Sequence, residues 1–408
     1  MLSKTLPFSY VKTITPPQMI ESQQAQTLGD VVKNDASVQS VRGYGNFAEA
    51  YRIRGFKLDG DDITMSGLFG VMPRQIVSTN MIDRVEILKG SNAFLNGVYA
   101  GCSGVGGSVN VGPKHADDVP LTRATIDYTS SSQVGGALDI GRRFVDDNRF
   151  GVRVNLLHRE GEAAIDDQRE RVSLAAVGLD YRGDCFRTSL DAGYQHQYLH
   201  GGRLGINVSA TGLQAIPELP TNTHNYSQRW VYTDMKSRFG MLRGEYDLDN
   251  HWTLYSGLGM SNTEEIGNYS TPKLTAAGDG SATWLDATLT KTRAGANDGN
   301  DVVGTPGYQL VFGSEYDVPS VEGLTLSGTV LRYGSQYANE ANTLKLKPWT
   351  RLDLGVRYSM PLNDHTLVWR ANVENVTNEK YWASVDDTGT YVTQGDPRSL
   401  RLSVSVDF

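Results

Sequence analysis

Apolar and polar residues alternate with a period of two through the chain from about residue 116 to its end. Near the C-terminus, Leu400, Leu402, Val404, Val406 and Phe408 alternate with Arg401, Ser403, Ser405 and Asp407. The same alternation runs through 150–156, 351–360 and 367–374. Successive side chains of a strand point to opposite faces, so each segment predicts a strand with one apolar and one polar face. From residue 116 onwards, the pattern indicates a mainly β protein.

Two architectures accommodate such strands: a soluble β-sandwich with an apolar core, and a transmembrane barrel with an apolar outer surface. The segments run for about ten residues or more, whereas most sandwich strands have about five or six. Their polar faces carry Arg, Asp and Glu, as strands around an aqueous lumen do. The short connections are 146–149, 183–184, 248–251 and 361–365, and the long ones are 161–168, 201–234, 262–306 and 381–397. Alternation of short and long connections is typical of outer-membrane barrels, so we expect an antiparallel transmembrane β-barrel.

The alternating segments number seven before the long connection 262–306 and five after it. The total of twelve is even, as expected of a single-chain bacterial barrel. Residues 281–291 read as a possible further strand, which would change this count.

The first 115 residues, approximately, follow a different pattern, in which short apolar pieces lie between glycines and 27–32 predicts a short helix. No apolar run approaches the roughly 18 residues of a membrane-spanning helix.

A net charge of -8 argues against a nucleic-acid partner. Cys102 and Cys185 lack metal-site spacing, and the sequence leaves open whether they pair. No catalytic motif occurs in a suitable context, so we expect no enzyme.

Several motifs carry a family resemblance. They are YRIRGF at 51–56, MIDRVEILKGSNAFLNG at 81–97, GVGGSVNVGPK at 104–114, NVENVTN at 372–378, YWAS at 381–384, the Pro397–Arg398 pair and the terminal Phe408. Together they resemble the plug and the last two strands of TonB-dependent siderophore receptors, over about 5–262 and 307–408. The resemblance implies an N-terminal α+β plug domain (1–115) followed by an antiparallel transmembrane β-barrel (116–408) in the bacterial outer membrane.

The resemblance also implies a function and partners. Such receptors bind a ferric siderophore at the outer face and import it, energised by the TonB–ExbB–ExbD complex of the inner membrane. The siderophore is cargo, so no permanently bound cofactor or metal is implied. Outer-membrane lipid and the barrel assembly machinery are further partners, with Phe408 as the assembly signal. Which siderophore is bound stays open, and we expect the export signal and the energy-coupling segment outside this sequence.

In this family the ligand lies where plug apices meet external loops, which implies ligand contacts for residues of two apices. The candidates are Arg42, Tyr44, Phe69, Met72 and Arg74. An Arg guanidinium can donate hydrogen bonds to hydroxamate or catecholate oxygens, and aromatic side chains can cover the apolar linkers of the chelator. The residues alone also fit another interpretation, in which the two arginines are solvated or paired loop residues.

Arg84 and Glu86 lie two residues apart and therefore share one face of a strand. In the resembled family such a pair meets opposite charges on the barrel and locks the plug; a local surface pair is the alternative. His196, His200 and His224 lie in or near the 201–234 connection, and their spacing fits no metal site.

The chain departs from the resembled family in its number of strands. Family members have about 22 strands, which gives a diameter of roughly 44 Å, whereas twelve strands give about 24 Å. A plug of this length has a diameter on the order of 34 Å and does not fit inside twelve closed strands. Three arrangements would resolve this conflict. The plug lies outside the barrel, the sheet stays open, or the chain has lost an internal segment of the barrel.

Open strand edges in lipid leave backbone groups unpaired, so we expect an internal deletion between 262 and 307. Two alternative functions remain: a truncated, non-transporting remnant that binds ligand or phage, and a passive porin-like barrel. A porin would not carry the plug motifs.

Overall fold

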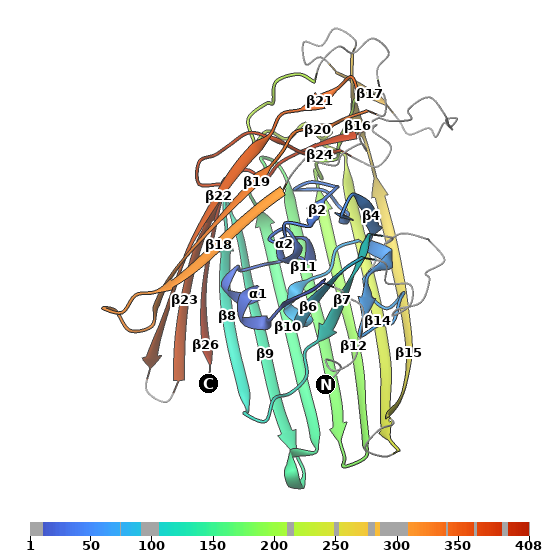
Figure 1. Cartoon of the computed structure of the whole chain (residues 1–408), viewed down its shortest axis with the longest axis vertical. Helices are drawn as coiled ribbons and strands as arrows, with labels where there is room; N and C mark the ends of the chain where they lie inside the picture. Colours follow the sequence, from blue (N-terminus) through green and yellow to red (C-terminus); the bar gives the residue numbers. More distant parts are fainter. Residues whose placement is uncertain are drawn as a thin grey trace.

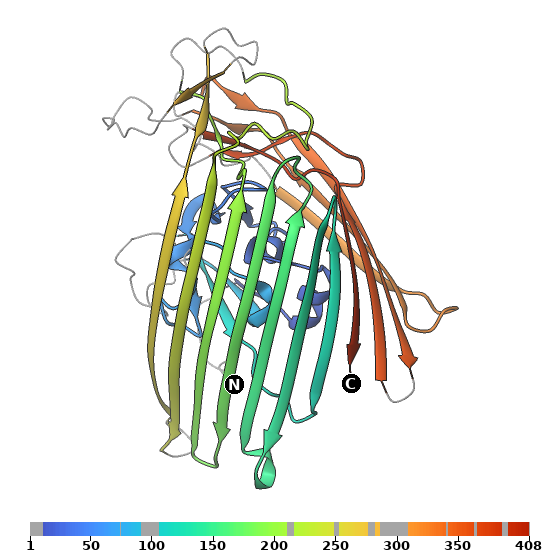
Figure 2. The same ribbon diagram turned by 180° about the vertical axis from the view of Figure 1, so that it is seen from behind.

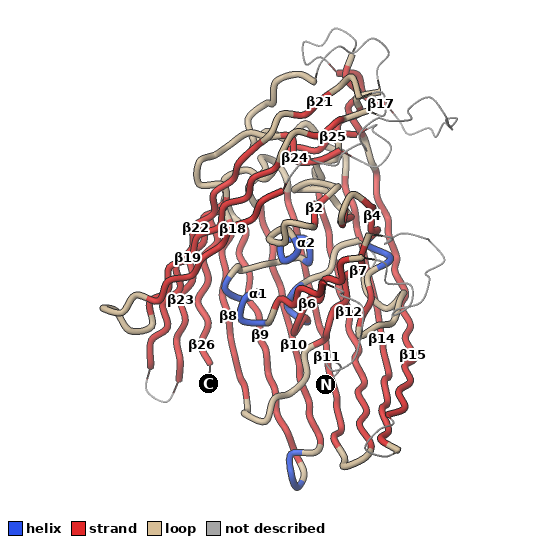
Figure 3. Tube along the Cα trace, viewed as in Figure 1, coloured by secondary structure: helices blue, strands red, loops and turns tan. Residues whose placement is uncertain are grey.

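The computed structural model describes residues 11–73, 75–90, 106–209, 216–248, 253–275, 282–285, 309–339, 342–362, 365–385 and 391–407. A small mixed domain lies on the concave side of a large curved sheet (Figures 1 and 2). Strands make up most of the chain, and the helices lie almost entirely in the small domain (Figure 3). In the described part of the chain, no helix is long and apolar enough to cross a membrane.

The small domain is the plug, built on two sheets. The first has the order β1 (Val11–Thr15), β6 (Ile82–Lys89), β7 (Gly107–Pro113), β5 (Thr64–Met65), and the second has the order β2 (Val38–Ser40), β3 (Ala50–Ile53), β4 (Phe56–Asp59). The helices are α1 (Pro17–Ser22) and α2 (Leu28–Val32), and the 3-10 turns are η1 (Gly60–Asp62) and η2 (Thr79–Met81).

Helix α2 begins with a capping box. Thr27 accepts a hydrogen bond from the backbone N–H of Asp30, and the Asp30 carboxylate accepts one from the backbone N–H of Thr27. Two of the otherwise unpaired N–H groups of the first turn are satisfied in this way. The helix predicted at 27–32 is therefore confirmed.

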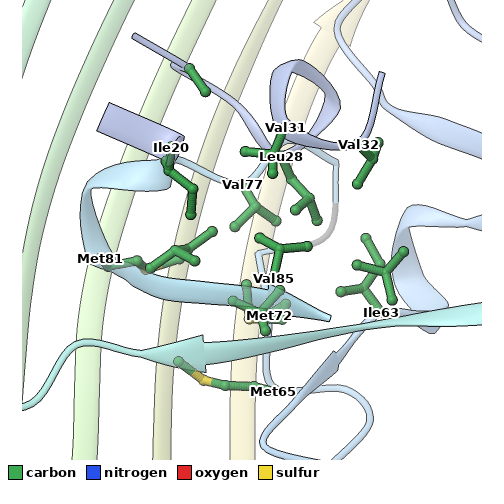
Figure 4. Packing of buried hydrophobic residues seen from close by; sticks show 14 of the residues in the cluster. Ile20, Leu28, Val31, Val32, Ile63, Met65, Met72, Val77, Met81 and Val85 are labelled. Carbon is green, nitrogen blue, oxygen red and sulfur yellow. The ribbon is translucent and has the colours of Figure 1, made fainter. Parts of the chain in front are cut away.

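The plug core joins α1, α2 and both sheets (Figure 4). Leu28, Val32, Tyr51 and Val85 have no exposed surface. Burial of each such side chain stabilises a fold by about 1.5–3 kcal/mol. The same apolar cluster continues into the curved sheet through Leu157, Val172, Leu174, Phe239 and Met241, so part of the plug is packed directly against the sheet.

The curved sheet, called the wall below, has twelve strands with antiparallel neighbours. Seven form the N-terminal wall: β8 (Leu121–Thr129), β9 (Gln133–Phe144), β10 (Phe150–Glu162), β11 (Arg169–Arg182), β12 (Phe186–His200), β14 (Tyr232–Asp247) and β15 (Thr253–Asn268). Five form the C-terminal wall: β18 (Gln309–Asp317), β19 (Leu324–Tyr333), β22 (Trp349–Leu362), β23 (His365–Glu374) and β26 (Ser399–Asp407). The predicted seven and five strands are confirmed, and β8 pairs with β26 to join the two halves.

The two faces of the wall have opposite chemistry. On β26, Leu400 and Leu402 are 37% and 39% exposed on the convex face, whereas Arg401 is 4% exposed on the concave face. On β9, Leu138 and Ile140 are exposed while Asp139 is buried against the plug side. A soluble sandwich buries its apolar face, so this arrangement is that of a wall in lipid around a polar interior.

Short turns lie at one end of the wall, including η3 (Asp146–Asn148), and long connections lie at the other. The long connections form an external cap of two small sheets. One has the order β17 (Ala282–Leu285), β16 (Thr271–Leu274), β13 (Ile206–Asn207), β25 (Tyr391–Gln394), β24 (Trp382–Val385), and the other pairs β20 (Gln336–Tyr337) with β21 (Lys345–Leu346). The possible strand at 281–291 corresponds to β17, which belongs to the cap rather than the wall.

The wall is an open sheet in the described part of the chain. Its strand order ends at β15 on one side and at β18 on the other, and these two strands are not paired with each other. Of the three arrangements that the size conflict allowed, the structure has the open sheet, and the plug lies on its concave face (Figure 1).

Candidate ligand-binding site

The first plug apex is a tight loop between β2 and β3. Gly43 and Gly45 have φ of +76° and +80°, a left-handed conformation that glycine adopts without strain. The Asn46 side chain donates to the Arg42 carbonyl at 3.1 Å and accepts from the backbone N–H of Ala48 at 3.1 Å. These contacts fix the loop that carries the first two candidate residues.

This apex is held against the external cap. The Gly45 carbonyl accepts hydrogen bonds from the Gln168 side chain and from the Arg203 backbone N–H, both at 2.8 Å. A Cβ on Gly45 would lie 2.4 Å from Ile165 Cδ1, so a larger residue there would have to displace this buried side chain as well as adopt a strained backbone. The hydroxyl of Ser384 in β24 donates to the Val41 carbonyl at 2.9 Å. The apex therefore meets the external connections, as the ligand hypothesis requires.

Tyr44 lines a cavity of about 160 Å³ between this loop and the inner face of the wall. Burial raises the pKa of the Tyr44 hydroxyl, so the group stays a neutral hydrogen-bond donor. Arg42 belongs to the same loop, and its side chain is exposed. The structure thus places one predicted residue in a cavity and the other beside it.

Three stacked aromatic rings, two from the wall and one from the connection after β23, line this cavity. The Trp349 ring lies 4.3 Å from that of Tyr333 and 4.1 Å from that of Tyr381, both stacked. Trp349 is 6% exposed, and its indole N–H has no hydrogen-bond acceptor among the described residues. An unpaired buried donor costs about 1–3 kcal/mol, which a ligand acceptor in the cavity would recover. Sequence reasoning missed these rings, although aromatic residues at inward strand positions stand out against polar neighbours.

Charged groups complete the cavity. The Glu49 carboxylate accepts hydrogen bonds from Thr27 Oγ1 at 2.5 Å, Tyr51 at 2.7 Å and the Gly29 N–H at 3.1 Å. Burial outweighs these contacts and raises the pKa of Glu49 to about 7. Asp30, Lys33, Arg351 and Arg401 line another part of the cavity. The cavity therefore offers an aromatic surface together with several hydrogen-bond donors.

The second predicted apex lies elsewhere. Met72 is 5% exposed in the plug core, so its side chain is not available at a surface. Phe69 is half-buried in a turn against β15, where the Ser261 hydroxyl donates to the Gly70 carbonyl at 2.6 Å. Neither residue lines the cavity of Tyr44. Arg74 lies outside the described residues, so its predicted role is not addressed by the structure.

The predicted lock residues pair with each other. Arg84 Nε lies 3.2 Å from Glu86 Oε1, and Asn110 donates to Glu86 at 2.9 Å. The Arg84 side chain is 45% exposed, and its ion pairs within the described residues are with Asp83 and Glu86. The lock role of this pair stays a prediction.

Phe408 lies outside the described residues, as does Cys102, whereas Cys185 is exposed in a short turn.

Ion pairs between plug and wall occur at positions that sequence reasoning did not single out. Asp30 pairs with Arg401, Lys33 with Glu374, Glu21 with Arg123 and Lys114 with Asp139, at 2.5–3.0 Å. The first three pairs join residues more than 100 positions apart, and Lys114 and Asp139 are 25 positions apart, so no local motif marks them.

The histidines singled out by the sequence do not gather into one site. His196 Nε2 lies 2.9 Å from an Asp234 carboxylate oxygen. No metal-holding group of His, Cys, Asp and Glu side chains occurs within the described ranges.

Comparison with known proteins identifies the family. A family model described as "TonB-dependent Receptor Plug Domain" matches residues 8–102, and one described as "TonB dependent receptor-like, beta-barrel" matches 267–376. The ferrichrome receptor FcuA of Yersinia enterocolitica is 39% identical over 656 residues, covering 100% of this chain and 86% of that protein. This chain belongs to the TonB-dependent siderophore receptors. A ferrioxamine receptor of the same organism is 30% identical over 115 residues, which is 28% of this chain and 16% of that receptor.

Solved structures share the receptor fold. BauA, the ferric preacinetobactin receptor of Acinetobacter baumannii, superposes with a TM-score of 0.90 at 24% identity, covering 98% of this chain and 96% of that chain. The ferric-catecholate import receptor Fiu of E. coli gives 0.77 at 13% identity, with 98% and 97% covered. Identities this low show the fold alone. As a TonB-dependent siderophore receptor, the chain is an outer-membrane protein from a family of receptors and transporters rather than enzymes.

Proposed function

We propose that this receptor imports a ferric hydroxamate siderophore across the outer membrane, with its plug (1–115) moved inside the barrel (116–408) by the TonB–ExbB–ExbD complex. Ferrichrome and ferrioxamine, which two relatives carry in their names, are both iron complexes of hydroxamates. Hydroxamate oxygens around iron carry partial negative charge and accept hydrogen bonds. The receptor has donors for such oxygens at the first apex.

The cavity at the first plug apex is the observation that carries the proposal. Tyr44 supplies a hydroxyl donor, Trp349 an unpaired N–H, and the stacked rings an apolar surface for the chelator backbone. Arg42 lies exposed on the same loop, where its guanidinium can reach a ligand bound above the cavity. The cavity is smaller than a whole chelate, so we propose that one arm enters it while the iron centre stays outside.

Binding and import are tested separately. Quenching of tryptophan fluorescence in the purified receptor measures affinity for ferrichrome, a ferrioxamine and a ferric catecholate. We expect tight binding of a hydroxamate, and Tyr44→Ala and Arg42→Ala each to weaken it about tenfold, or 1.4 kcal/mol. Tyr316→Ala, on the exposed face of β18, is the matched control and should bind normally. Preference for the catecholate, or binding unaffected by either variant, contradicts the proposed ligand class.

Import is measured as uptake of radioactive iron by an iron-starved host that lacks its own receptors. We expect hydroxamate-dependent uptake that disappears when TonB is absent or the proton-motive force is collapsed. Uptake that persists without TonB favours a passive barrel, and binding without uptake favours the remnant.

The open sheet favours the remnant as a second candidate. Strands β15 and β18 end the wall without pairing with each other in the described chain, and exposed edges are costly in lipid. The alignment with FcuA extends over 656 residues, although this chain has 408, so the relative has segments with no counterpart here. Both observations support the proposed deletion between 262 and 307.

The genomic sequence around codons 262 to 307 tests the deletion. An uninterrupted reading frame in independent isolates would establish the short receptor as the natural form, whereas inserted codons would restore further strands between β15 and β18. Phe408 as the signal for the assembly machinery is part of the same proposal, and Phe408→Ala should lower the amount of receptor in the outer membrane.

A further inference from the structure

Two cavities lie in the seam between the plug and the C-terminal wall. The first is the cavity of Tyr44, and the second, of about 590 Å³, lies between α1 and the inner faces of β19, β22 and β23. Asp30 and Lys33 line both cavities. The ion pairs of these two residues therefore stand at the boundary between the candidate ligand cavity and the larger one, here called the seam cavity.

The plug is held differently on its two sides. On the N-terminal wall, Leu157, Phe239 and Met241 belong to the same apolar cluster as the plug core. On the C-terminal wall, most residues that line the seam cavity are small or polar, such as Ser327 and Gly355, and Leu354 and Val373 are the apolar exceptions among the larger ones. Separating an apolar contact exposes buried apolar surface at about 25 cal/mol per Å², whereas a polar seam can fill with water. Separation at the C-terminal seam therefore exposes less apolar surface than separation from the N-terminal wall.

The charges at the boundary are arranged so that separation leaves none of them alone. Lys33 Nζ lies 2.9 Å from both Asp30 and Glu374, and Arg401 lies 3.0 Å from Asp30 and 3.4 Å from Glu374. If the plug moves away, Asp30 and Lys33 stay paired on the plug, and Glu374 and Arg401 stay paired on the wall. Leaving one charge buried without a partner costs about 3–5 kcal/mol, and this arrangement avoids that cost.

We propose that the ferric chelate crosses the receptor along the C-terminal seam, with the Asp30–Lys33 and Glu374–Arg401 pairs as its gate, while the plug stays on the N-terminal wall. The proposal rests on the import function proposed above. Opening the gate joins the ligand cavity to the seam cavity, whose plug side is lined by residues of α1 and its flanks. The chelate thus needs a local displacement of α1 and α2 rather than release of the whole plug.

A thiol-labelling experiment tests the gate whether or not the chain imports iron. Ser327→Cys places a thiol in the seam cavity of a receptor whose own cysteines are replaced by serine. A charged, membrane-impermeant thiol reagent is added from outside to cells carrying this receptor. We expect Asp30→Asn with Lys33→Met to raise the labelling rate at least tenfold over the receptor with an intact gate.

The matched control for labelling is Asp35→Asn with Lys89→Met, which removes an ion pair of 2.8 Å between two plug residues that do not line the seam cavity. This control should leave the labelling rate unchanged. An unchanged rate in the gate variant, or an equal rise in both variants, overturns the gate.

Crosslinks across each side of the plug test the route itself. Asn372 of β23 donates to the Ser22 carbonyl at 2.9 Å, and Gln195 of β12 accepts from the Ser78 N–H at 3.0 Å. A short bifunctional thiol reagent can therefore link cysteines placed at these positions. The pair at 22 and 372 ties the plug to the C-terminal wall, and the pair at 78 and 195 ties it to the N-terminal wall. We expect the first link to stop import with ligand binding retained, and the second to leave import intact.

Two other outcomes of the crosslinks overturn the route. Loss of import with both links shows that the plug leaves as a whole, and loss with neither shows that the chelate passes elsewhere. A receptor without crosslinks that imports nothing contradicts the proposed function instead, and the labelling result still decides the gate.

Discussion

Arg401, in the last strand of the wall, donates from both Nη atoms to the Asp30 carboxylate in plug helix α2, at 3.0 and 3.3 Å. The two residues are 371 positions apart in the chain. Burial alone would raise the pKa of Asp30, but the charges of Arg401 and Lys33 lower it well below its usual range. The stability that this carboxylate contributes is present above its ordinary pKa of about 4 and is lost only in strong acid. The contact between plug and wall therefore stays charged throughout the physiological range.

Arg401→Met should weaken this contact by about 3 kcal/mol, because a buried carboxylate loses one of its two cationic partners. Hydrogen exchange of α2 amides in the purified receptor measures the effect as faster exchange. Arg169→Met is the control, since the Arg169 side chain is 61% exposed and pairs with Glu160 at the surface, where ion pairs contribute little to stability. Equal exchange in the two variants would contradict the assignment.

Glu49→Gln should remove a pH dependence of plug stability. Because burial raises the pKa of Glu49 to about 7, the folded plug holds a proton that the unfolded chain releases above about 4.5. Its stabilising contribution is therefore complete below pH 4.5 and is lost as the pH rises through 7. Hydrogen exchange of α2 in the unaltered receptor should speed up between pH 5 and 8 beyond the intrinsic rate. The same profile in Glu49→Gln would refute this source of the pH dependence.

Trp349→Phe should weaken ligand binding about five- to tenfold, because the variant keeps a stacked ring but lacks the unpaired N–H. Ferrichrome binding to the purified receptor, followed by calorimetry, measures the loss. Trp369→Phe is matched to it, since Trp369 is 51% exposed on the outer face of β23. A full-affinity Trp349→Phe receptor would show that the N–H does not contact the ligand.

Arg203→Met should loosen the external cap. The Arg203 guanidinium is fully buried and donates to the Asn222 carbonyl, to Gln394 Oε1 and to the Gly395 carbonyl, at 2.8–3.3 Å. Removing it leaves buried acceptors unpaired, at about 1–3 kcal/mol each. Limited proteolysis within 201–231 should become at least fivefold faster. Arg229→Met, at an exposed position of the same connection, should leave the cleavage rate unchanged.

The strands were predictable because their chemistry is local. Alternating residues such as Leu400 and Arg401 determine which face meets lipid, and Thr27 marks the start of α2. The family motifs indicate where the plug apices lie, and one of these apices carries Tyr44. They also suggested Met72, which lies in the plug core because neighbouring residues of an apex loop can face opposite ways.

The rest of the site was not predictable because it depends on register and long-range pairing. Tyr333, Trp349 and Tyr381 stack only because β19 and β22 pair in one register and Tyr381, which follows β23 in the chain, packs against the Trp349 ring. The gate residues come from α2 with its C-cap, β23 and β26, and no spacing in the sequence joins the plug pair Asp30–Lys33 to Glu374 or Arg401. The open edge between β15 and β18 is one of the three arrangements that the sequence allows. The strand count shows that the plug is too large for a closed barrel of twelve strands, but it does not show which arrangement the chain adopts.

The apolar cluster shared by the plug and the N-terminal wall also bears on biogenesis. Residues 11–268 contain the plug core and all seven strands of the N-terminal wall, so the first part of the polypeptide to be made can already bury its main core. The five later strands then join through a single seam, β8 with β26, whose closure must wait for the last residues of the chain. Maturation of this receptor should accordingly pass through an early intermediate with a protected plug and an unpaired β8.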